Sequence, residues 1–213
     1  MRKAKSYMRP SPDEPIVIES LLKLSRLAMQ FDRVDRVTLL FDGTTPESDT
    51  DHTFMLSLLA CAFAERFIPE LDLGLVAQFA ILHDFVEVYA GDTPTLLITS
   101  QERINKSQKE HQALKLFKRD FRSIFPWVPN TINVYEQLTL PEARYVKAID
   151  KLMPDITHIL NKGAYIKQTK VTKNFLEKRF RELATESSSY ADEFEALVQL
   201  RDKLRAEILN FTD

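Results

Sequence analysis

The sequence predicts an all-α fold, a bundle of helices with a further helical extension at its C-terminal end. Apolar residues recur at the spacing of an amphipathic helix along most of the chain. The alternation of apolar and polar residues that is typical of a strand is nearly absent. Only 4 of the 213 residues are glycines, and they are scattered. The Gly-rich phosphate turns of dinucleotide-binding and P-loop folds are therefore excluded.

The first fifty residues contain one predicted helix. Residues 1–14 are basic and then Pro-rich, which indicates a mobile tail. From Ile16 to Phe31 the apolar residues recur at helical spacing, and we expect a helix there. Residues 32–50 alternate briefly and contain the turn signal Asp42-Gly43, so we expect an ordered loop with room for a short hairpin.

The central part of the chain predicts three helices. The first begins near Asp49 or Thr50 and ends before Pro69. The next runs over residues 72–91, is apolar on most faces and ends at Gly91, so we expect the most buried helix here. A loop over residues 92–99 separates it from a long amphipathic helix over about residues 100–123.

The C-terminal part predicts further helices. A short one spans roughly residues 130–138, and another begins at Pro141, a favoured first residue, and continues to Ile159. Residues 162–171 are polar and indicate a loop. Residues 172–210 indicate one or two helices, with a possible break at the serine run 187–189.

Composition and length constrain the class of protein. A content of 44% hydrophobic and 28% charged residues with a net charge of −2 is that of a globular protein and does not indicate binding to a nucleic-acid polymer. We expect a tail over 1–14, a core domain over 15–165 and a helical extension over 166–213 that packs on it. The single cysteine, the lack of a secretory signal and the lack of an apolar run of membrane-spanning length predict a cytoplasmic protein.

Ionisable residues interrupt the most apolar predicted helix. His83 and Asp84 lie in its middle, where a charged carboxylate is costly to bury unless it is paired or binds a cation. Glu87 follows on the same helical face, and Asp92 lies just past the helix end. These four residues can line one pocket, which is difficult to explain by packing alone.

His52 and Asp150 are the other candidate metal ligands. Each is a polar residue on a helical stripe that otherwise faces the core. Two imidazoles with two carboxylates suit a divalent ion such as Mn²⁺, Co²⁺, Fe²⁺ or Zn²⁺. Asp150 has an alternative interpretation as an ion-pair partner of Lys147 or Arg144 on its own helix.

Three segments resemble the HD-domain phosphohydrolases, specifically their 5′-deoxynucleotidase-like subfamily. The isolated histidine, the HD dipeptide and the distant aspartate reproduce the H…HD…D pattern of that family. PESDTDH resembles its PES-x-x-[DE]-H segment, HDFVEVYAGDTPT its HD-x-x-E-x-x-x-GD-x-P-T segment, and AIDKL its final metal-ligand segment. The resemblance covers residues from about 33 to 160.

The resemblance implies an HD-domain fold, one divalent metal ion (Mn, Co, Fe, Zn or Mg), a small nucleotide substrate and a homodimer. Its implied metal ligands are His52, His83, Asp84 and Asp150. Glu87 would be the acid/base group for the attacking water, and Asp92 would help to place the water or the leaving group. The substrate phosphate would meet an arginine before PES, for which Arg36 is preferred to Arg33, while Val37 stands where several relatives have an aromatic residue. Lys151 and Lys147 are lesser candidates for phosphate binding.

The implied activity is hydrolysis of (deoxy)nucleoside 5′-monophosphates to nucleoside and phosphate. The alternatives are a dNTP hydrolase with the same metal centre and a non-catalytic helical module that binds a nucleotide or a partner protein. Other polar residues have structural interpretations at this point. Asp49 and Asp51 are interpreted as helix-capping residues, His111 as a surface histidine, His158 as a hydrogen-bonded core histidine and Trp127 as a packing residue.

Overall fold

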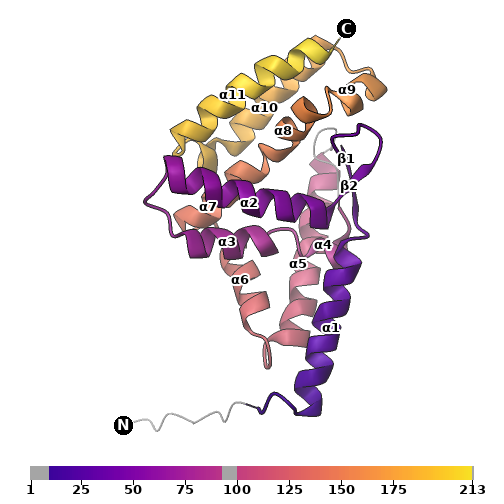
Figure 1. Cartoon of the computed structure of the whole chain (residues 1–213), viewed down its shortest axis with the longest axis vertical. Helices are drawn as coiled ribbons and strands as arrows, with labels where there is room; N and C mark the ends of the chain where they lie inside the picture. Colours follow the sequence, from indigo (N-terminus) through magenta and orange to yellow (C-terminus); the bar gives the residue numbers. More distant parts are fainter. Residues whose placement is uncertain (1–9, 93–99, 213) are drawn as a thin grey trace.

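The computed structural model describes residues 10–92 and 100–212, and its regular structure there is almost entirely helical. The all-α prediction is confirmed, with the addition of one two-stranded hairpin. Residues 1–9 of the predicted tail and residues 93–99 of the predicted loop lie outside the described residues. Figure 1 shows the order of the elements along the chain. The elements are α1 (Pro15–Phe31), β1 (Asp35–Leu39), β2 (Pro46–Ser48), α2 (Asp49–Phe67), α3 (Leu73–Leu82), α4 (Glu87–Ala90), α5 (Ser100–Phe121), α6 (Trp127–Glu136), α7 (Pro141–Asp150), α8 (Met153–Leu160), α9 (Ala164–Thr169), α10 (Lys173–Ala191), α11 (Glu195–Ile208) and η1 (Leu209–Phe211).

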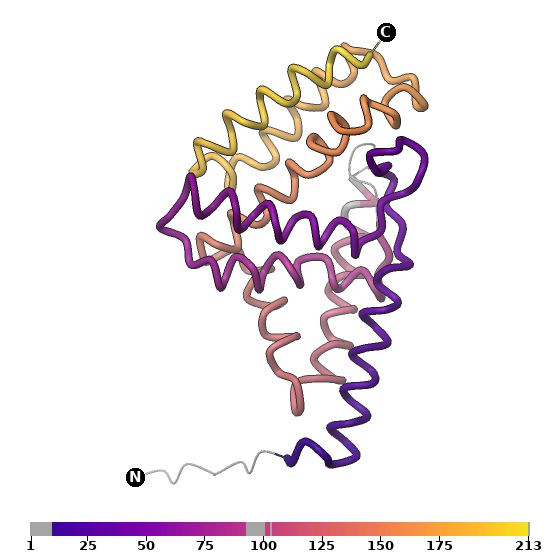
Figure 2. Tube along the Cα trace, viewed as in Figure 1, coloured from indigo at the N-terminus to yellow at the C-terminus, as the bar shows by residue number. Residues whose placement is uncertain are grey.

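The helices form three tiers in the view of Figure 1. Helices α2 and α3 lie side by side across the middle and contact α7. Helices α1 and α6 lie below them, α5 runs from the level of α2 down beside α1, and α8, α9, α10 and α11 lie above. The Cα trace in Figure 2 shows that the hairpin loop between β1 and β2 lies beside the chain of α8 and α9, which both contact β1.

The main hydrophobic core lies between α2, α3 and α7. Leu56, Phe79 and Ile149 are among its fully buried side chains. Tyr145 is also buried here, and its hydroxyl donates a 2.8 Å hydrogen bond to the carbonyl oxygen of Ala60 on α2. A second core joins α1, α5 and α6, and a third, smaller one joins α9, α10 and α11. The main core therefore fixes the three segments that carry the candidate metal ligands relative to one another.

The hairpin leads directly into α2. Strand β1 pairs antiparallel with β2, as the alternation near residues 37–41 allowed. Ser48 ends β2 and caps α2: its hydroxyl accepts from the backbone N–H of Asp51, and the Asp51 carboxylate accepts from the backbone N–H of Ser48. This reciprocal capping box satisfies backbone donors that the first helical turn leaves unpaired. The capping interpretation of Asp51 is confirmed.

The predicted continuous helix over residues 72–91 is wrong. Helix α3 ends at Leu82, and α4 begins at Glu87. Between them the backbone makes tighter turns, with N–H groups of Phe85 and Glu87 bonded to the carbonyl oxygens three residues earlier. The predicted helix from Pro141 to Ile159 is divided in the same way between α7 and α8, just after Asp150. Both interruptions fall at candidate metal ligands.

Two further boundaries in the C-terminal third differ from the prediction. The predicted loop over residues 162–171 contains α9, because Ile166 is buried against the third core and holds this polar segment in place. Helix α10 continues through the serine run to Ala191, and the chain turns at residues 192–194 instead. The hydroxyl of Ser187 donates to the carbonyl oxygen of Leu183, which satisfies a buried serine inside a helix.

Residues Leu73–Ala90 are apolar enough over 18 residues to cross a membrane by length and composition, contrary to the sequence prediction. The stretch is divided at Leu82, and its buried side chains Val76, Phe79 and Ala80 pack in the main core against neighbouring helices. It contains the buried polar residues His83 and Glu87. Its apolar character is accounted for by its central place in the fold.

Candidate metal centre

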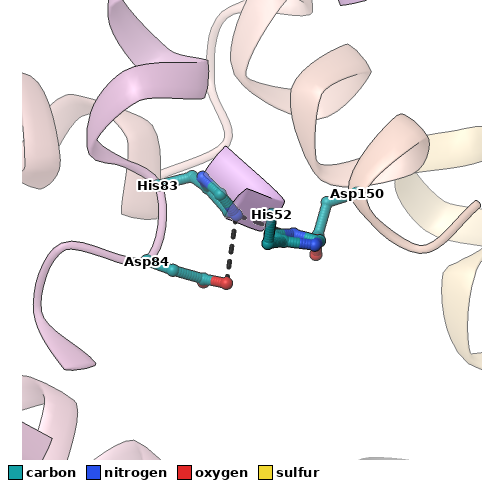
Figure 3. A group of neighbouring side chains, drawn as sticks. All are labelled: His52, His83, Asp84 and Asp150. Carbon is teal, nitrogen blue, oxygen red and sulfur yellow. Dashed lines mark hydrogen bonds and ion pairs between the residues drawn. The ribbon is translucent and has the colours of Figure 1, made fainter. Parts of the chain in front are cut away.

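Four side chains from three separate segments converge on one point. His52 comes from α2, His83 and Asp84 follow α3, and Asp150 ends α7. One ligand atom of each lies within 4.8 Å of all the others. Nε2 of His52 lies 3.1 Å from Oδ1 of Asp150, and Nε2 of His83 lies 3.0 Å from Oδ2 of Asp84. Figure 3 shows the four side chains directed toward one another. The sequence prediction that these residues share one site agrees with their placement.

Each imidazole is oriented by a contact to its other ring nitrogen. Nδ1 of His83 donates a 2.8 Å hydrogen bond to the carbonyl oxygen of Ala80, so Nε2 carries the lone pair that faces the cluster. Nδ1 of His52 lies 3.3 Å from Oε1 of Glu47, a carboxylate on β2 that is buried. Carboxylates and carbonyls in such positions orient histidine ligands in metal sites. The sequence interpretation gave no role to Glu47, although the PES segment contains it.

The chemistry of these donors fits a divalent metal ion. Nε2 of His83 is buried and lies 3.0 Å from Oδ2 of Asp84, but it makes no well-aligned hydrogen bond with any described residue. Burial lowers the pKa of His52, but its hydrogen bonds to the accepting carboxylates of Asp150 and Glu47 outweigh burial and raise the pKa to about 9. Positive charge is therefore favoured at this point. Two nitrogen and two carboxylate ligands are compatible with Mn, Co, Fe or Zn and do not select among them.

Arg36 lies at the edge of the cluster. Its Nη1 donates to Oδ1 of Asp49 at 3.0 Å and to Oδ2 of Asp84 at 3.1 Å. Burial lowers the pKa of Arg36, but the surrounding carboxylates outweigh burial and raise it above its ordinary value. The guanidinium is thus a fixed positive charge beside the candidate ligands. Arg33 is exposed and does not line the cleft described below, so the structure brings only the preferred arginine to the cluster.

Asp49 has a larger part in the site than the sequence indicated. It begins α2, as the capping interpretation requires, but its side chain is fully buried and pairs with Arg36. Burial raises the pKa of Asp49 to about 6, and the charge of Arg36 opposes that shift. Periodicity could not identify this role, because a carboxylate in the first turn of a helix is already accounted for by the helix dipole.

Glu87 is buried at the first position of α4, with Lys106 of α5 as its partner. Nζ of Lys106 donates to Oε1 of Glu87 at 2.8 Å. Burial, followed by repulsion from Asp84, raises the pKa of Glu87 well above its ordinary value, and Lys106 opposes this shift. A carboxyl group in this state can hold a proton near neutral pH. The sequence interpretation missed Lys106, because a lysine on a charged, amphipathic helix is usually a solvated residue.

A cleft of about 360 Å³ opens from the cluster, a size within the range of small-molecule sites. Asp92, Lys147 and Lys151 line it together with Arg36 and Lys106. Nζ of Lys151 lies 2.6 Å from Oδ2 of Asp150. The alternative pairing of Asp150 with Lys147 or Arg144 is not seen among the described residues: Asp150 pairs with the adjacent Lys151, and Arg144 pairs with Glu193.

The remaining polar residues divide between surface and core. His111 is exposed, as predicted. His158 is a buried core residue, as predicted, but its ring is not fully hydrogen-bonded, because Nδ1 has no partner among the described residues. Trp127 is 46% exposed, and its indole N–H donates to Gln78 at 2.8 Å.

Comparison with known proteins assigns the family. The HD domain family matches residues 29–201, which is most of the chain. The chain belongs to the HD domain family. In this HD-domain protein, His83 and Asp84 form the only His-Asp dipeptide of the sequence.

Two curated relatives are each 25% identical to this HD-domain protein. One is 5′-deoxynucleotidase hdd1 of Schizosaccharomyces pombe, which aligns over 114 residues, 50% of this chain and 54% of that enzyme. The other is 5′-deoxynucleotidase YGK1 of Saccharomyces cerevisiae, which aligns over 152 residues, 67% of this chain and 64% of that enzyme. The chain thus spans less than two thirds of the length of either relative.

Solved structures share the fold. The crystal structure of a predicted metal-dependent phosphohydrolase from Magnetospirillum magnetotacticum MS-1 superposes with a TM-score of 0.71 at 22% identity, over 92% of this chain and 97% of that chain. A conserved hypothetical protein from Pyrococcus furiosus superposes with a TM-score of 0.59 at 22% identity, over 87% of this chain and 99% of that chain. These likenesses show that the fold is shared over 92% and 87% of this chain, respectively.

Proposed function

We propose that this HD-domain protein is a metal-dependent phosphohydrolase that acts on (deoxy)nucleoside 5′-monophosphates. One observation carries the proposal: a cluster of two histidines and two aspartates lies beside the guanidinium of Arg36 at one end of a cleft. In the proposed reaction, water forms a bond to phosphorus while the ester P–O bond breaks. The products are inorganic phosphate and a nucleoside whose 5′ oxygen gains a proton.

The proposed metal ligands are His52, His83, Asp84 and Asp150. A bound divalent ion supplies positive charge that polarises a phosphoryl oxygen and lowers the pKa of a nearby water. Arg36 would bind the phosphate as well, because a guanidinium offers two parallel donors to phosphate oxygens. Its contacts to Asp49 and Asp84 hold it in place before substrate arrives, which favours stabilisation of the transition state. Lys151 is a second candidate cation for the phosphate, since it lines the cleft.

Glu87 is the proposed acid/base group. Its buried carboxyl group has a raised pKa and lies next to Lys106, so it can accept a proton from the attacking water and return it. Asp92 lines the cleft that opens from the cluster and is proposed to position the water or the leaving oxygen. Both roles need substrate in place, because a catalytic base must be within hydrogen-bond reach of the proton that it removes.

The choice of substrate is supported by the printed functions of the two curated relatives, both 5′-deoxynucleotidases. The competing proposal is hydrolysis of dNTPs at the same metal centre. Phosphate release from dNMPs and dNTPs, with Mn²⁺ or Co²⁺ added, separates the two. We expect inorganic phosphate from dNMPs and little product from dNTPs. Release of triphosphate, or product from dNTPs alone, would refute the monophosphatase proposal.

The Glu87→Gln variant tests whether the protein is an enzyme or a non-catalytic binding module. We expect it to retain metal and nucleotide binding and to lose phosphate release by a factor of about 10² or more, the size of an acid/base contribution. Glu110→Gln is a suitable control, because Glu110 also contacts Lys106. An undiminished rate in Glu87→Gln would contradict the assignment, and absence of metal from the native protein would favour the non-catalytic module.

A cytoplasmic homodimer completes the proposal. The single cysteine, Cys61, is free, which suits a reducing compartment. Helices α1 and α2 expose large apolar side chains, including Leu22, Met29, Phe54 and Leu58. Apolar surface of this kind is typical of interfaces between protein chains. Light scattering of the purified protein gives the oligomeric state, and a monomer at micromolar concentration would refute the dimer.

A further inference from the structure

The cleft extends well beyond the metal cluster, into the tier formed by α8, α9 and α10. The residues that line this far end are mostly apolar or aromatic and come from the C-terminal third of the chain. They are Pro154, Tyr165, Ile166, Leu176, Phe180 and Leu183. Ile166 and Leu176 belong to the third hydrophobic core, so this wall is part of the folded interior. Figure 1 shows these helices on the side of the molecule opposite to α1 and α6. We call this end of the cleft the apolar compartment.

Among the described residues, the apolar compartment contains a buried ring nitrogen without a hydrogen-bond partner. His158 of α8 lines the cleft, is 8% exposed, and its Nδ1 makes no hydrogen bond within residues 10–92 and 100–212. A buried ring nitrogen without a partner costs free energy, so its position calls for an explanation. Burial lowers the pKa of His158 to about 4, against a small opposing effect of Glu47. The imidazole is therefore neutral near pH 7, with one nitrogen that donates and one that accepts.

Two buried charged groups of the compartment, Asp155 and Arg205, neutralise each other. Arg205 donates from Nε to Oδ2 of Asp155 at 2.9 Å and from Nη1 to the carbonyl oxygen of Phe180 at 3.2 Å. Both side chains of the ion pair are buried. No cation is thus left for a second phosphate here among the described residues Asp155, His158 and Arg205, and the Asp155 carboxylate disfavours an anion. The compartment suits an uncharged group with a flat apolar surface and a hydrogen-bonding edge.

Aromatic rings favour a planar heterocycle as that group. The rings of His158 and Tyr165 are nearly parallel, with an interplanar angle of 7° and a centroid distance of 6.3 Å. Phe180 and Tyr190 also line the cleft. Stacking of a nucleobase on such rings contributes about 1–3 kcal/mol per base in other proteins. A nucleobase also presents both donors and acceptors at its edge, which matches a neutral imidazole.

We propose that the apolar compartment binds the base of the nucleotide, with the imidazole of His158 as the hydrogen-bonding partner of the base edge. This inference rests on the proposed function, because it assigns the organic half of the substrate whose phosphate lies at the metal cluster. It assigns base recognition to α8, α9 and α10, outside the segments that carry the metal ligands. In this arrangement the base is contacted mainly by residues of α8, α9 and α10, and less by Val37, the residue after Arg36.

Binding of a nucleoside without phosphate tests the compartment separately from the reaction. Isothermal titration of the full chain with 2′-deoxyadenosine is compared with titration with 2-deoxyribose. We expect the nucleoside to bind and the sugar not to bind. His158→Leu should weaken nucleoside binding about tenfold or more, the effect of leaving one buried polar group of the ligand unpaired. His111→Leu replaces an exposed histidine and should leave the affinity unchanged.

A second variant keeps the test decisive if His158→Leu unfolds. Leu183 is only partly buried on α10 and lines the compartment, so Leu183→Trp should fill it and abolish nucleoside binding while the protein stays folded. Phosphate release by the wild type from 2-deoxyribose 5-phosphate, which has no base, tests the metal cluster separately from the compartment. Equal nucleoside affinity in wild type and Leu183→Trp, or no binding to the wild type, would overturn the base-binding proposal. Failure of phosphate release alone, with nucleoside binding intact, would overturn the proposed function and leave the compartment standing.

Discussion

Nη1 of Arg36 lies 3.1 Å from Oδ2 of Asp84, so the proposed phosphate-binding cation touches a proposed metal ligand. The same nitrogen also donates to Asp49, which is fully buried and cannot turn toward solvent. The guanidinium is therefore fixed at the edge of the cluster before any substrate binds. Preorganised charge of this kind stabilises a transition state without reorganisation at the moment of reaction.

Replacement of Arg36 by Met should impair phosphate release, whereas Arg33→Met should not. Loss of a charged hydrogen-bond donor costs about 1.5–3 kcal/mol, so we expect kcat/KM for a nucleoside monophosphate to fall by a factor of about 10 to 10². Arg33 is the matched control, because it precedes the same segment but is exposed and outside the cleft. Steady-state kinetics of both variants make the comparison. Equal losses in the two would remove Arg36 from the proposed site.

Glu47 should tune the metal affinity through His52. Glu47→Gln removes the carboxylate charge that lies 3.3 Å from Nδ1 of His52 while keeping the size of the side chain. Partners in such positions typically contribute 10- to 100-fold to metal affinity. We expect the metal dissociation constant to rise by about that factor, and activity to recover at saturating metal. Glu65→Gln, on the exposed face of α2, is the control.

The metal affinities of wild type and Glu47→Gln are measured by titrating the metal-free proteins with Mn²⁺ or Zn²⁺, with calorimetry or thermal shift as the readout. A purely structural role for Glu47 would lower the melting temperature of metal-free protein without changing the metal affinity. That result would contradict the positioning role. A Glu47→Gln variant that cannot be rescued by excess metal would contradict it as well.

The sequence predicted the helical class, and the resemblance to the H…HD…D pattern, together with polar residues on apolar stripes, implied that the four candidate ligands share one site. It did not predict the ends of the helices that carry them. Periodicity continues through His83 and Asp84, but the backbone turns there and α4 begins again at Glu87. The local pattern carries no signal for this turn, because the turn depends on contacts made far away in the sequence.

Partners of the proposed site residues were the least predictable part. Glu47, Asp49 and Lys106 each lie on a surface-like stretch of sequence, yet the structure buries or half-buries them against His52, Arg36 and Glu87. An ion pair between distant segments leaves no trace in spacing or composition. The lining of the apolar compartment was equally hidden, since the charged faces of residues 172–210 indicated a solvated helix.

The ion pair between Asp155 and Arg205 should be a major contributor to stability. It joins α8 to α11, and both side chains are buried. Arg205→Met would leave the Asp155 carboxylate without its partner, which typically costs about 3–5 kcal/mol. We expect the free energy of unfolding in urea to fall by about that amount. Lys203→Met, on the exposed face of α11, should leave it nearly unchanged.

A double variant separates the charge effect from packing. Asp155→Asn together with Arg205→Met removes both charges, so it should be more stable than Arg205→Met alone. The guanidinium also lies 5.0 Å from the centroid of the Phe180 ring, and the double variant still loses that contact. Equal stability of the single and double variants would show that packing, not the buried charge, dominates.

His158 should make the protein less stable as pH falls. Its folded-state pKa is lowered to about 4, whereas the unfolded imidazole has a pKa of 6.5. Between these values the unfolded chain binds a proton that the folded chain does not, so stability is fully present above about pH 6.5 and declines toward pH 4. The loss due to this residue is at most about 3 kcal/mol. Urea unfolding of wild type and His158→Leu at pH 7 and pH 4.5 measures this loss. Between these two pH values the free energy of unfolding should fall more in the wild type than in His158→Leu. His111→Leu should follow wild type at both values, and a parallel decline of all three proteins would mean that His158 titrates freely in the folded state.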